Sequence, residues 1–334
     1  MSEKTYKLAV VGATGLVGRT ALKVLEEKNL PISEYVFFSS IRSAGTSLFF
    51  QGREYIVKEL KEDSFDNAGF DFAIFSAGSS TAKKFAPIAA ANGCIVVDNS
   101  SAFRMEEDVP LVVPEVNPET IFQNKGIIAN PNCSTIQAVV ALKPLDDAYH
   151  IKRIVYSTYQ AVSGAGRLGV EDLKNGAKGE KPLKFPHPIY NNCLPHIDDF
   201  LEDGYTKEEK KMVDETRKIL KRPDLKITAT AVRVPVLNSH SESINVEFEK
   251  DFDLENLKQK LANFPNIVVL DDVSKSIYPL AVKATGSDAV YVGRIRRDTS
   301  VPSGVNLWVV ADNIRKGAAS NAVQIVERMI IQDR

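Results

Sequence analysis

The chain has 334 residues, of which 44% are hydrophobic and 25% charged, as in a globular protein with a sizeable buried core. The net charge of −1 gives no reason to expect nucleic acid or an anionic membrane as a partner. No apolar run reaches the roughly 18 residues of a membrane-spanning helix. The N-terminus is polar as far as Lys7, so we expect no signal peptide. Cys94, Cys133 and Cys193 lie far apart, which favours a reducing cytoplasm and no metal site.

The first 130 residues alternate strand and helix patterns. Short apolar runs predict strands at 7–11, 36–39, 71–76, 94–98 and 126–129, with helices at 19–27 and 81–92 between them. Continuous apolar strands separated by helices indicate a parallel sheet that is covered on both faces. With right-handed crossovers, this predicts a doubly wound, Rossmann-like α/β domain.

The pattern changes near residue 151. Longer runs, several of them alternating, predict a mixed or antiparallel sheet from strands at 154–160, 227–234, 243–249 and 306–311. Helices are expected at 207–220 and 254–264, and an extended loop at 175–196. The amphipathic segment 317–332 can return to the first domain. We therefore expect one domain from 1–130 with about 313–334, and an α+β domain from 131–312.

A glycine-rich loop follows the first strand. In GATGLVG, Gly12, Gly15 and Gly18 lie between a strand and a helix, where the backbone can approach a pyrophosphate. The spacing differs from the usual GxGxxG, and a tight turn without ligand is the alternative. The second strand ends without the acid that NAD-binding folds place there. Arg42 and Ser43 follow it instead, which favours NADP over NAD.

Cys133 opens the apolar segment that follows Asn130-Pro131-Asn132. Pro131 favours a helix start, and Asn132 is a candidate N-cap. A thiol at this position feels the positive end of the helix dipole, which favours the thiolate. The alternative for a lone cysteine is a small buried core residue.

A thiolate and a bound nicotinamide together indicate thioester-forming aldehyde chemistry, which needs a nearby proton carrier. His240 lies in a polar segment between two strand-like runs, so we expect an exposed imidazole that titrates near neutrality. The alternative is an ordinary surface histidine. Arg104 follows the strand that ends at Asp98 and could bind phosphate with two donors. Arg233 lies inside an apolar strand, which predicts a carboxylate partner and leaves an internal ion pair as the alternative.

Many segments in one order resemble bacterial aspartate-semialdehyde dehydrogenase over nearly the whole chain. They are VVGATGLVG, SIRSAG, DNSSAFR, VVPEVNP, NPNCSTIQ, STYQAVSGAG, EEKKMVDETRKIL, VRVPVLNSHSES, DDVSKSIYP, VGRIRRD and WVVADNIRKGAASNAVQI. The resemblance implies NADPH-dependent reduction of L-aspartyl 4-phosphate to L-aspartate 4-semialdehyde and phosphate. This step belongs to the biosynthesis of lysine (through diaminopimelate), threonine, methionine and isoleucine. It also implies a homodimer formed through the second domain.

The resemblance also implies residue roles. Cys133 would be the acyl-thioester nucleophile, His240 the general acid/base, and Gln160 would orient the substrate. Arg104 and Lys211 would bind phosphate, Arg233 the substrate α-carboxylate and Glu208 its α-amino group. Glu209 and Lys210 are the alternative register on the charged helix. The implied NADP contacts are Gly12, Thr14, Gly15, Leu16, Val17, Arg42, Ser43, Ser163, Gly164 and Asn313.

Three other functions remain open at this point. N-acetyl-γ-glutamyl-phosphate reductase shares the architecture, but its substrate has no free ammonium group for Glu208. Phosphorylating glyceraldehyde-3-phosphate dehydrogenase shares the chemistry, but NCSTIQ does not match its nucleophile pattern. A non-catalytic NADP-binding sensor would not need Cys133, Gln160 and His240 together.

Overall fold

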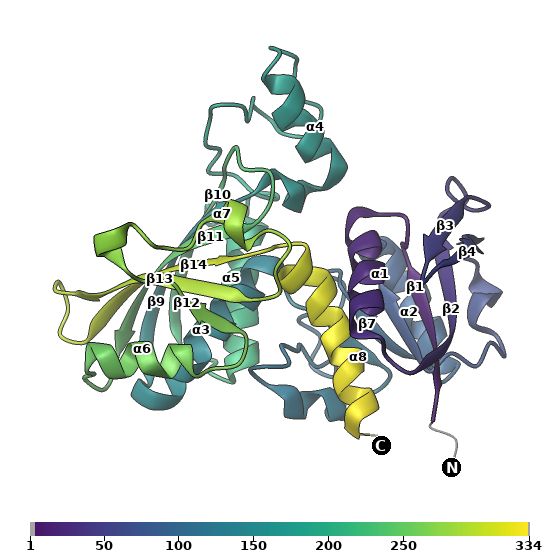
Figure 1. Ribbon diagram of the computed structural model, residues 1–334, viewed down its shortest axis with the longest axis horizontal. Coiled ribbons are helices and arrows are strands. Elements are labelled where there is room, and N and C mark those ends of the chain that lie inside the picture. The colour runs from purple at the N-terminus through teal and green to yellow at the C-terminus, as the bar shows by residue number, and fades with distance from the viewer. Residues whose placement is uncertain (1–3, 333–334) are drawn as a thin grey trace. The chain divides into compact units, whose positions relative to one another are not determined.

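The computed structural model describes residues 4–332, which form two compact units (Figure 1). The first unit comprises 4–131 and 318–332, and the second comprises Asn132–Gly317. The chain thus leaves the first unit at residue 131 and returns to it at residue 318, whereas the sequence-based division used residues 130 and about 313. No helix within 4–332 is long and apolar enough to cross a bilayer.

The first unit contains a six-stranded parallel sheet in the order β5-β2-β1-β6-β7-β8. Its strands are β1 (Tyr6–Val11), β2 (Ile32–Ser39), β5 (Lys58–Glu59), β6 (Phe72–Phe75), β7 (Ile95–Asp98) and β8 (Ile127–Ala129). The helices are α1 (Leu16–Lys28), α2 (Ser79–Ala91) and α8 (Ser320–Gln332), with 3₁₀ turns at Glu62–Phe65 and Pro118–Gln123. This order confirms the predicted Rossmann-like domain.

Helices cover both faces of this sheet. Alternate strand residues point to opposite sides, so each strand contributes side chains to two cores. In β1, Leu8 and Val10 belong to the core that includes α1 and α8, whereas Ala9 and Val11 belong to the core that includes α2. All four are fully buried, which explains why the strand reads as one continuous apolar run.

The second unit contains a six-stranded mixed sheet in the order β10-β9-β11-β14-β13-β12. Its strands are β9 (Ile151–Gln160), β10 (Lys226–Arg233), β11 (His240–Phe248), β12 (Ile267–Val269), β13 (Val290–Asp298) and β14 (Gly304–Ala311). β9 runs parallel to β10 and antiparallel to β11. The helices are α3 (Cys133–Tyr149), α4 (Gly166–Gly176), α5 (Lys207–Leu220), α6 (Leu254–Ala262) and α7 (Ala281–Ala284), with 3₁₀ turns at Val162–Ala165 and Val273–Lys275. The mixed sheet was predicted.

Helix α3 is central to the second unit. It contacts β9, β11, β13 and β14 as well as α5 and α6. Its side chains are buried nearly all round, as expected for an apolar helix enclosed by other elements. Its first residue, Cys133, is therefore held by a rigid element.

Several elements were not predicted. A hairpin of β3 (Ser47–Phe50) and β4 (Arg53–Ile56) follows β2, and its short strands carry little periodic signal. Helix α4 and strand β13 were also missed. The predicted helix 317–332 is divided into a π-helical turn, Arg315–Ala319, and α8.

Candidate active site

Cys133 is the first residue of α3. The chain enters the helix through the extended residue Asn132, whose carbonyl accepts the amide of Ile136 at 2.9 Å and closes the first turn. Asn132 occupies the N-cap position, but its side chain makes no capping hydrogen bond. Instead, its Nδ2 donates to Glu208 Oε1 at 2.8 Å. The predicted N-cap position is confirmed, but the side chain of Asn132 is turned toward Glu208 and does not cap the helix.

His240 is the first residue of β11, and its Nε2 lies 3.3 Å from the Cys133 Sγ. Its other ring nitrogen, Nδ1, accepts the backbone N–H of Ala161 at 3.0 Å. The imidazole is fully buried, so the exposed histidine that we expected is wrong. Burial and then the charge of Arg233 lower the pKa of His240 well below its usual value. The polar residues next to His240 in the sequence gave no sign of burial, because the residues that bury it belong to α3.

Gln160 ends β9 and lies beside the buried carboxylate of Glu208. Its Nε2 donates to Glu208 Oε1 and to Thr158 Oγ1, both at 3.2 Å. Burial raises the pKa of Glu208. Attraction to Lys211, hydrogen bonds from Asn132 and Gln160, and Arg233 outweigh that effect, so the net direction is downward. Glu208 therefore presents a negative charge inside the site.

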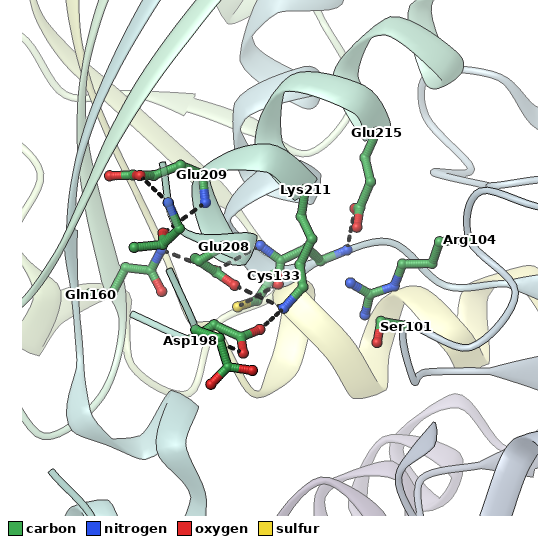
Figure 2. A network of polar contacts seen from close by, with 12 residues as sticks. Ser101, Arg104, Cys133, Gln160, Asp198, Glu208, Glu209, Lys211 and Glu215 are labelled. Carbon is green, nitrogen blue, oxygen red and sulfur yellow. Dashed lines mark hydrogen bonds and ion pairs between the residues drawn. The ribbon is translucent and has the colours of Figure 1, made fainter. Parts of the chain in front are cut away.

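Lys211 lies between two carboxylates, as Figure 2 shows. Its Nζ is 2.7 Å from Asp198 Oδ2 and 3.3 Å from Glu208 Oε2. The side chains of the alternative register, Glu209 and Lys210, have other partners. Glu209 forms a capping box with Thr206 and accepts the amide of Ala231 at 2.9 Å, and Lys210 pairs with an aspartate on the exposed helix surface.

Arg233 ends β10 and pairs in register with Gln160. Its Nη1 donates to the carbonyl of Ala161 at 2.7 Å. Within residues 4–332, no carboxylate lies at ion-pair distance from it, and its buried Nε has no hydrogen-bond partner. The internal ion pair, which the sequence analysis left open as the alternative, is therefore absent from the described residues. A buried guanidinium that retains donor capacity suits a carboxylate that arrives with a ligand. Gly164 packs against this group, since a Cβ there would lie 2.9 Å from Arg233 Nη1.

Arg104 belongs to the first unit and is buried there. Its Nε donates to the carbonyl of Asn130 at 2.9 Å and its Nη2 to the carbonyl of Asn99 at 3.0 Å. Two backbone carbonyls therefore fix the plane of the guanidinium. Asp98 lies close enough to interact with the charge of Arg104. Burial raises the pKa of Asp98, and the hydrogen bonds from Ser100 and the charge of Arg104 lower it only in part.

The glycine loop of the first unit has the form of a phosphate cradle. Gly12 adopts φ +83°, and a Cβ there would lie 2.6 Å from the Ser76 carbonyl, so glycine is required. Gly15 is the N-cap of α1 and brings no side chain, which leaves the helix N-terminus open to an anion. A pocket of about 780 Å³ lies beside it, lined by Thr14, Ser43 and residues of α1 and β3. These residues fit a dinucleotide phosphate.

The remaining expected cofactor residues lie in the second unit. Asn313 Nδ2 donates to the Ser163 hydroxyl at 3.1 Å, and Asn313 Oδ1 accepts the amide of Ser239 at 2.9 Å. Ser163 and Gly164 lie in the 3₁₀ turn that follows Gln160. The segment after β9 thus contains two of the expected cofactor contacts, Ser163 and Gly164, and also Ala161, whose backbone N–H donates to His240.

Sequence reasoning missed several residues of this site. At Gly317, a Cβ would lie 2.8 Å from the Cys133 Cβ, so only glycine leaves room for the first turn of α3. Glu242 follows His240 by two residues on the same face of β11 and is fully buried. Neither carboxyl oxygen of Glu242 has a hydrogen-bond partner within residues 4–332. Gln137 and Asp198 were also missed. A charged residue at an inward position of an alternating strand was the available signal for Glu242.

Comparison with known proteins places this chain in a family. Residues 7–124 match the semialdehyde dehydrogenase NAD-binding domain, and residues 142–316 match the semialdehyde dehydrogenase dimerisation domain. An aspartate-semialdehyde dehydrogenase of Aquifex aeolicus is 57% identical over 97% of this chain and 98% of its own. The chain belongs to the aspartate-semialdehyde dehydrogenase family. It is accordingly an oxidoreductase of amino-acid biosynthesis, as the resemblance implied.

Solved structures agree with this membership. Aspartate semialdehyde dehydrogenase II of Vibrio cholerae, complexed with ASA, superposes with a TM-score of 0.93 at 46% identity, covering 98% of both chains. The Candida albicans enzyme with NADP superposes with a TM-score of 0.78 at 26% identity, covering 98% of both. Family membership and the glycine loop together indicate a nicotinamide dinucleotide as the cofactor.

Proposed function

We propose that this enzyme converts L-aspartyl 4-phosphate to L-aspartate 4-semialdehyde through an acyl thioester on Cys133. The main observation in support is the 3.3 Å approach of His240 Nε2 to Cys133 Sγ at the N-terminus of α3. The sulfur attacks the acyl carbon, the bond to the phosphate oxygen breaks, and a thioester forms. In the reverse direction phosphate releases the acyl group.

The charged groups match the substrate. Glu208 would bind its ammonium group because the carboxylate is buried yet held negative. Arg233 would bind the α-carboxylate through donors that no protein carboxylate occupies. Gln160, which is held by Thr158 and Glu208, would orient the acyl group. Arg104 and Lys211 would bind the phosphate.

The proposed cofactor is NADP. When bound, NADPH supplies the hydride that reduces the thioester carbonyl. The loop from Gly12 to Val17, with Thr14, Gly15 and Leu16, would hold the pyrophosphate, and Arg42 and Ser43 would meet the 2′-phosphate. No carboxylate within residues 39–43 opposes that charge. Ser163, Gly164 and Asn313 would contact the dinucleotide from the second unit.

We expect a homodimer in the cytoplasm. The face of the mixed sheet opposite α3 carries an aromatic pair, Tyr159 and Trp308, with ring centroids 5.5 Å apart. Tyr159 and Tyr278 are 39% and 40% exposed, and Tyr278 lines a groove together with Trp308. A dimer through this face would cover them.

The proposal is tested with aspartate semialdehyde, NADP and phosphate. We expect NADP reduction that depends on phosphate. Cys133→Ala should abolish turnover but leave NADP binding intact. Cys193→Ser is the matched control because Cys193 is exposed and has no assigned role. A mass increase equal to the acyl group, found on Cys133 in rapidly quenched enzyme, would support the thioester. Full activity of Cys133→Ala would exclude it, and preference for the N-acetylated homologue would favour N-acetyl-γ-glutamyl-phosphate reductase.

A further inference from the structure

The pocket beside the glycine loop is lined by more cationic than acidic side chains. It lies between α1 on one side and strand β3 with the segment before it on the other (Figure 1), and its volume is about 780 Å³. Arg19 and Lys23 of α1 line it together with one acid, Glu26, whose Oε1 accepts the backbone N–H of Gln51. Among residues 4–332, neither Arg19 nor Lys23 forms an ion pair. The pocket therefore presents positive charge that suits an anionic ligand.

Arg19 is held at the end of this pocket that lies next to the glycine loop. It belongs to the first turn of α1, and helical side chains lean toward the N-terminus of their helix. Its Nε donates to the carbonyl of Thr14 at 3.0 Å. A guanidinium carries five N–H donors, so the four on Nη1 and Nη2 remain for a ligand. The bond to Thr14 keeps these donors beside the loop that would hold the pyrophosphate.

Ser43 lines the same pocket as Arg19 and lies on a well-fixed segment after β2. The backbone N–H of Ser43 donates to the carbonyl of Ser40 at 2.9 Å, and the hydroxyl of Thr46 donates to the carbonyl of Ser43 at 2.7 Å. These local bonds set the position of Ser43 without the help of a ligand. A hydroxyl and a guanidinium that line one pocket can donate to the same phosphate group.

We propose that Arg19 is a further specificity residue of the cofactor site, and that its Nη donors bind the 2′-phosphate of NADP together with Arg42 and Ser43. This inference rests on NADP as the cofactor proposed above. The forked donors of a guanidinium match the oxygens of a phosphate, whereas NAD offers only a ribose hydroxyl at that position. Arg19 is not among the cofactor residues that the resemblance implied.

The hydrogen bond to Thr14 has a second explanation, in which Arg19 only supports the glycine loop. Loss of such support would weaken the binding of NADPH and NADH alike, because both contain the pyrophosphate that the loop would hold. Loss of a contact to the 2′-phosphate would weaken the binding of NADPH alone. The ratio of the two dissociation constants therefore distinguishes the two roles.

The test is a binding titration of the full-length enzyme with NADPH and NADH, and with 2′,5′-ADP and 5′-AMP as fragments that lack the nicotinamide. Arg19→Gln keeps a donor for the Thr14 carbonyl but removes the charge. We expect it to raise the Kd of NADPH and of 2′,5′-ADP about tenfold, the lower end of the loss for a charged hydrogen bond because Arg19 is exposed. The Kd of NADH and of 5′-AMP should stay the same. Arg19→Lys retains the charge and should lose less affinity than Arg19→Gln.

Lys23→Met is the matched control, because it removes one positive charge from the same helix and pocket, about one turn farther from Thr14. We expect a smaller effect on NADPH, since solvent and salt screen an exposed charge that makes no contact. Equal losses in Lys23→Met and Arg19→Gln would indicate a general effect of charge and overturn the inference. An unchanged ratio of NADPH to NADH affinity in Arg19→Gln would also overturn it, while the NADP cofactor would stand. Equal affinity of the wild type for NADPH and NADH would refute the NADP cofactor itself, and this inference with it.

Discussion

Replacing Glu242 with glutamine should make the enzyme more stable at alkaline pH. Glu242 is fully buried on β11, and neither carboxyl oxygen has a hydrogen-bond partner among residues 4–332. Burial and then repulsion from Glu208 raise the pKa of Glu242 well above its usual value. The folded enzyme therefore holds Glu242 as a neutral acid, for which an uncharged glutamine has nearly the same shape.

The size of the stability change follows from the uptake or release of a single proton by Glu242. In the unfolded chain, glutamate loses its proton near pH 4.3, whereas the folded group keeps it to higher pH. Between those two pKa values the folded state binds one proton more, so the free energy of unfolding falls by about 1.4 kcal/mol per pH unit. The loss ends where the folded group also ionises. Glu242→Gln lacks this term, so the stability difference from wild type should widen as the pH rises from about 5.

The assay is urea or thermal unfolding of both proteins at one protein concentration across pH 5–9. Each kcal/mol should appear as a shift of about 2–4 °C in Tm for a unit of this size. Glu202→Gln, at an exposed position, is the matched control and should parallel the wild type. Parallel pH curves for Glu242→Gln and wild type would show that Glu242 ionises normally in the folded state and would refute the reasoning.

Three other predictions follow from the site. Gly317→Ala should lower kcat by about 100-fold, because its Cβ would lie 2.8 Å from the Cys133 Cβ and displace the Cys133 side chain. An unchanged rate of thiol alkylation would argue against this displacement. Asp198→Asn should lower the KM for phosphate a few-fold, within the 0.2–1 kcal/mol of a partly exposed ion pair, because Lys211 loses a competing carboxylate. A higher phosphate KM would instead make Asp198 a residue that positions the lysine. Glu208→Gln should raise the KM for aspartate semialdehyde about 10–100-fold while NADP binding stays unchanged, the loss expected for a charged hydrogen bond; an unaltered KM would assign Glu208 to structure.

Most of the fold could be predicted from the sequence, because strands of the two sheets lie in different environments and therefore show different patterns of apolar residues. β1 is buried on both faces and reads as an unbroken apolar run, whereas β11 alternates because one face meets α3 and the other does not. Both patterns are local, so a single sequence reveals them. The β3–β4 hairpin and the π-helical turn before α8 depend on short segments whose conformation is set by neighbours, and no periodicity marked them.

The positions of several predicted residues could be read from the sequence, but the environments of their side chains could not. Cys133 was placed at a helix start from Pro131 and the apolar segment that follows. The burial of His240, by contrast, depends on α3, more than 90 residues away in the chain. The partner of Arg233 is likewise a backbone carbonyl, that of Ala161 just after β9, rather than a side chain. Contacts between residues far apart in the sequence therefore determine the environments of His240 and Arg233, and the local sequence does not reveal these contacts.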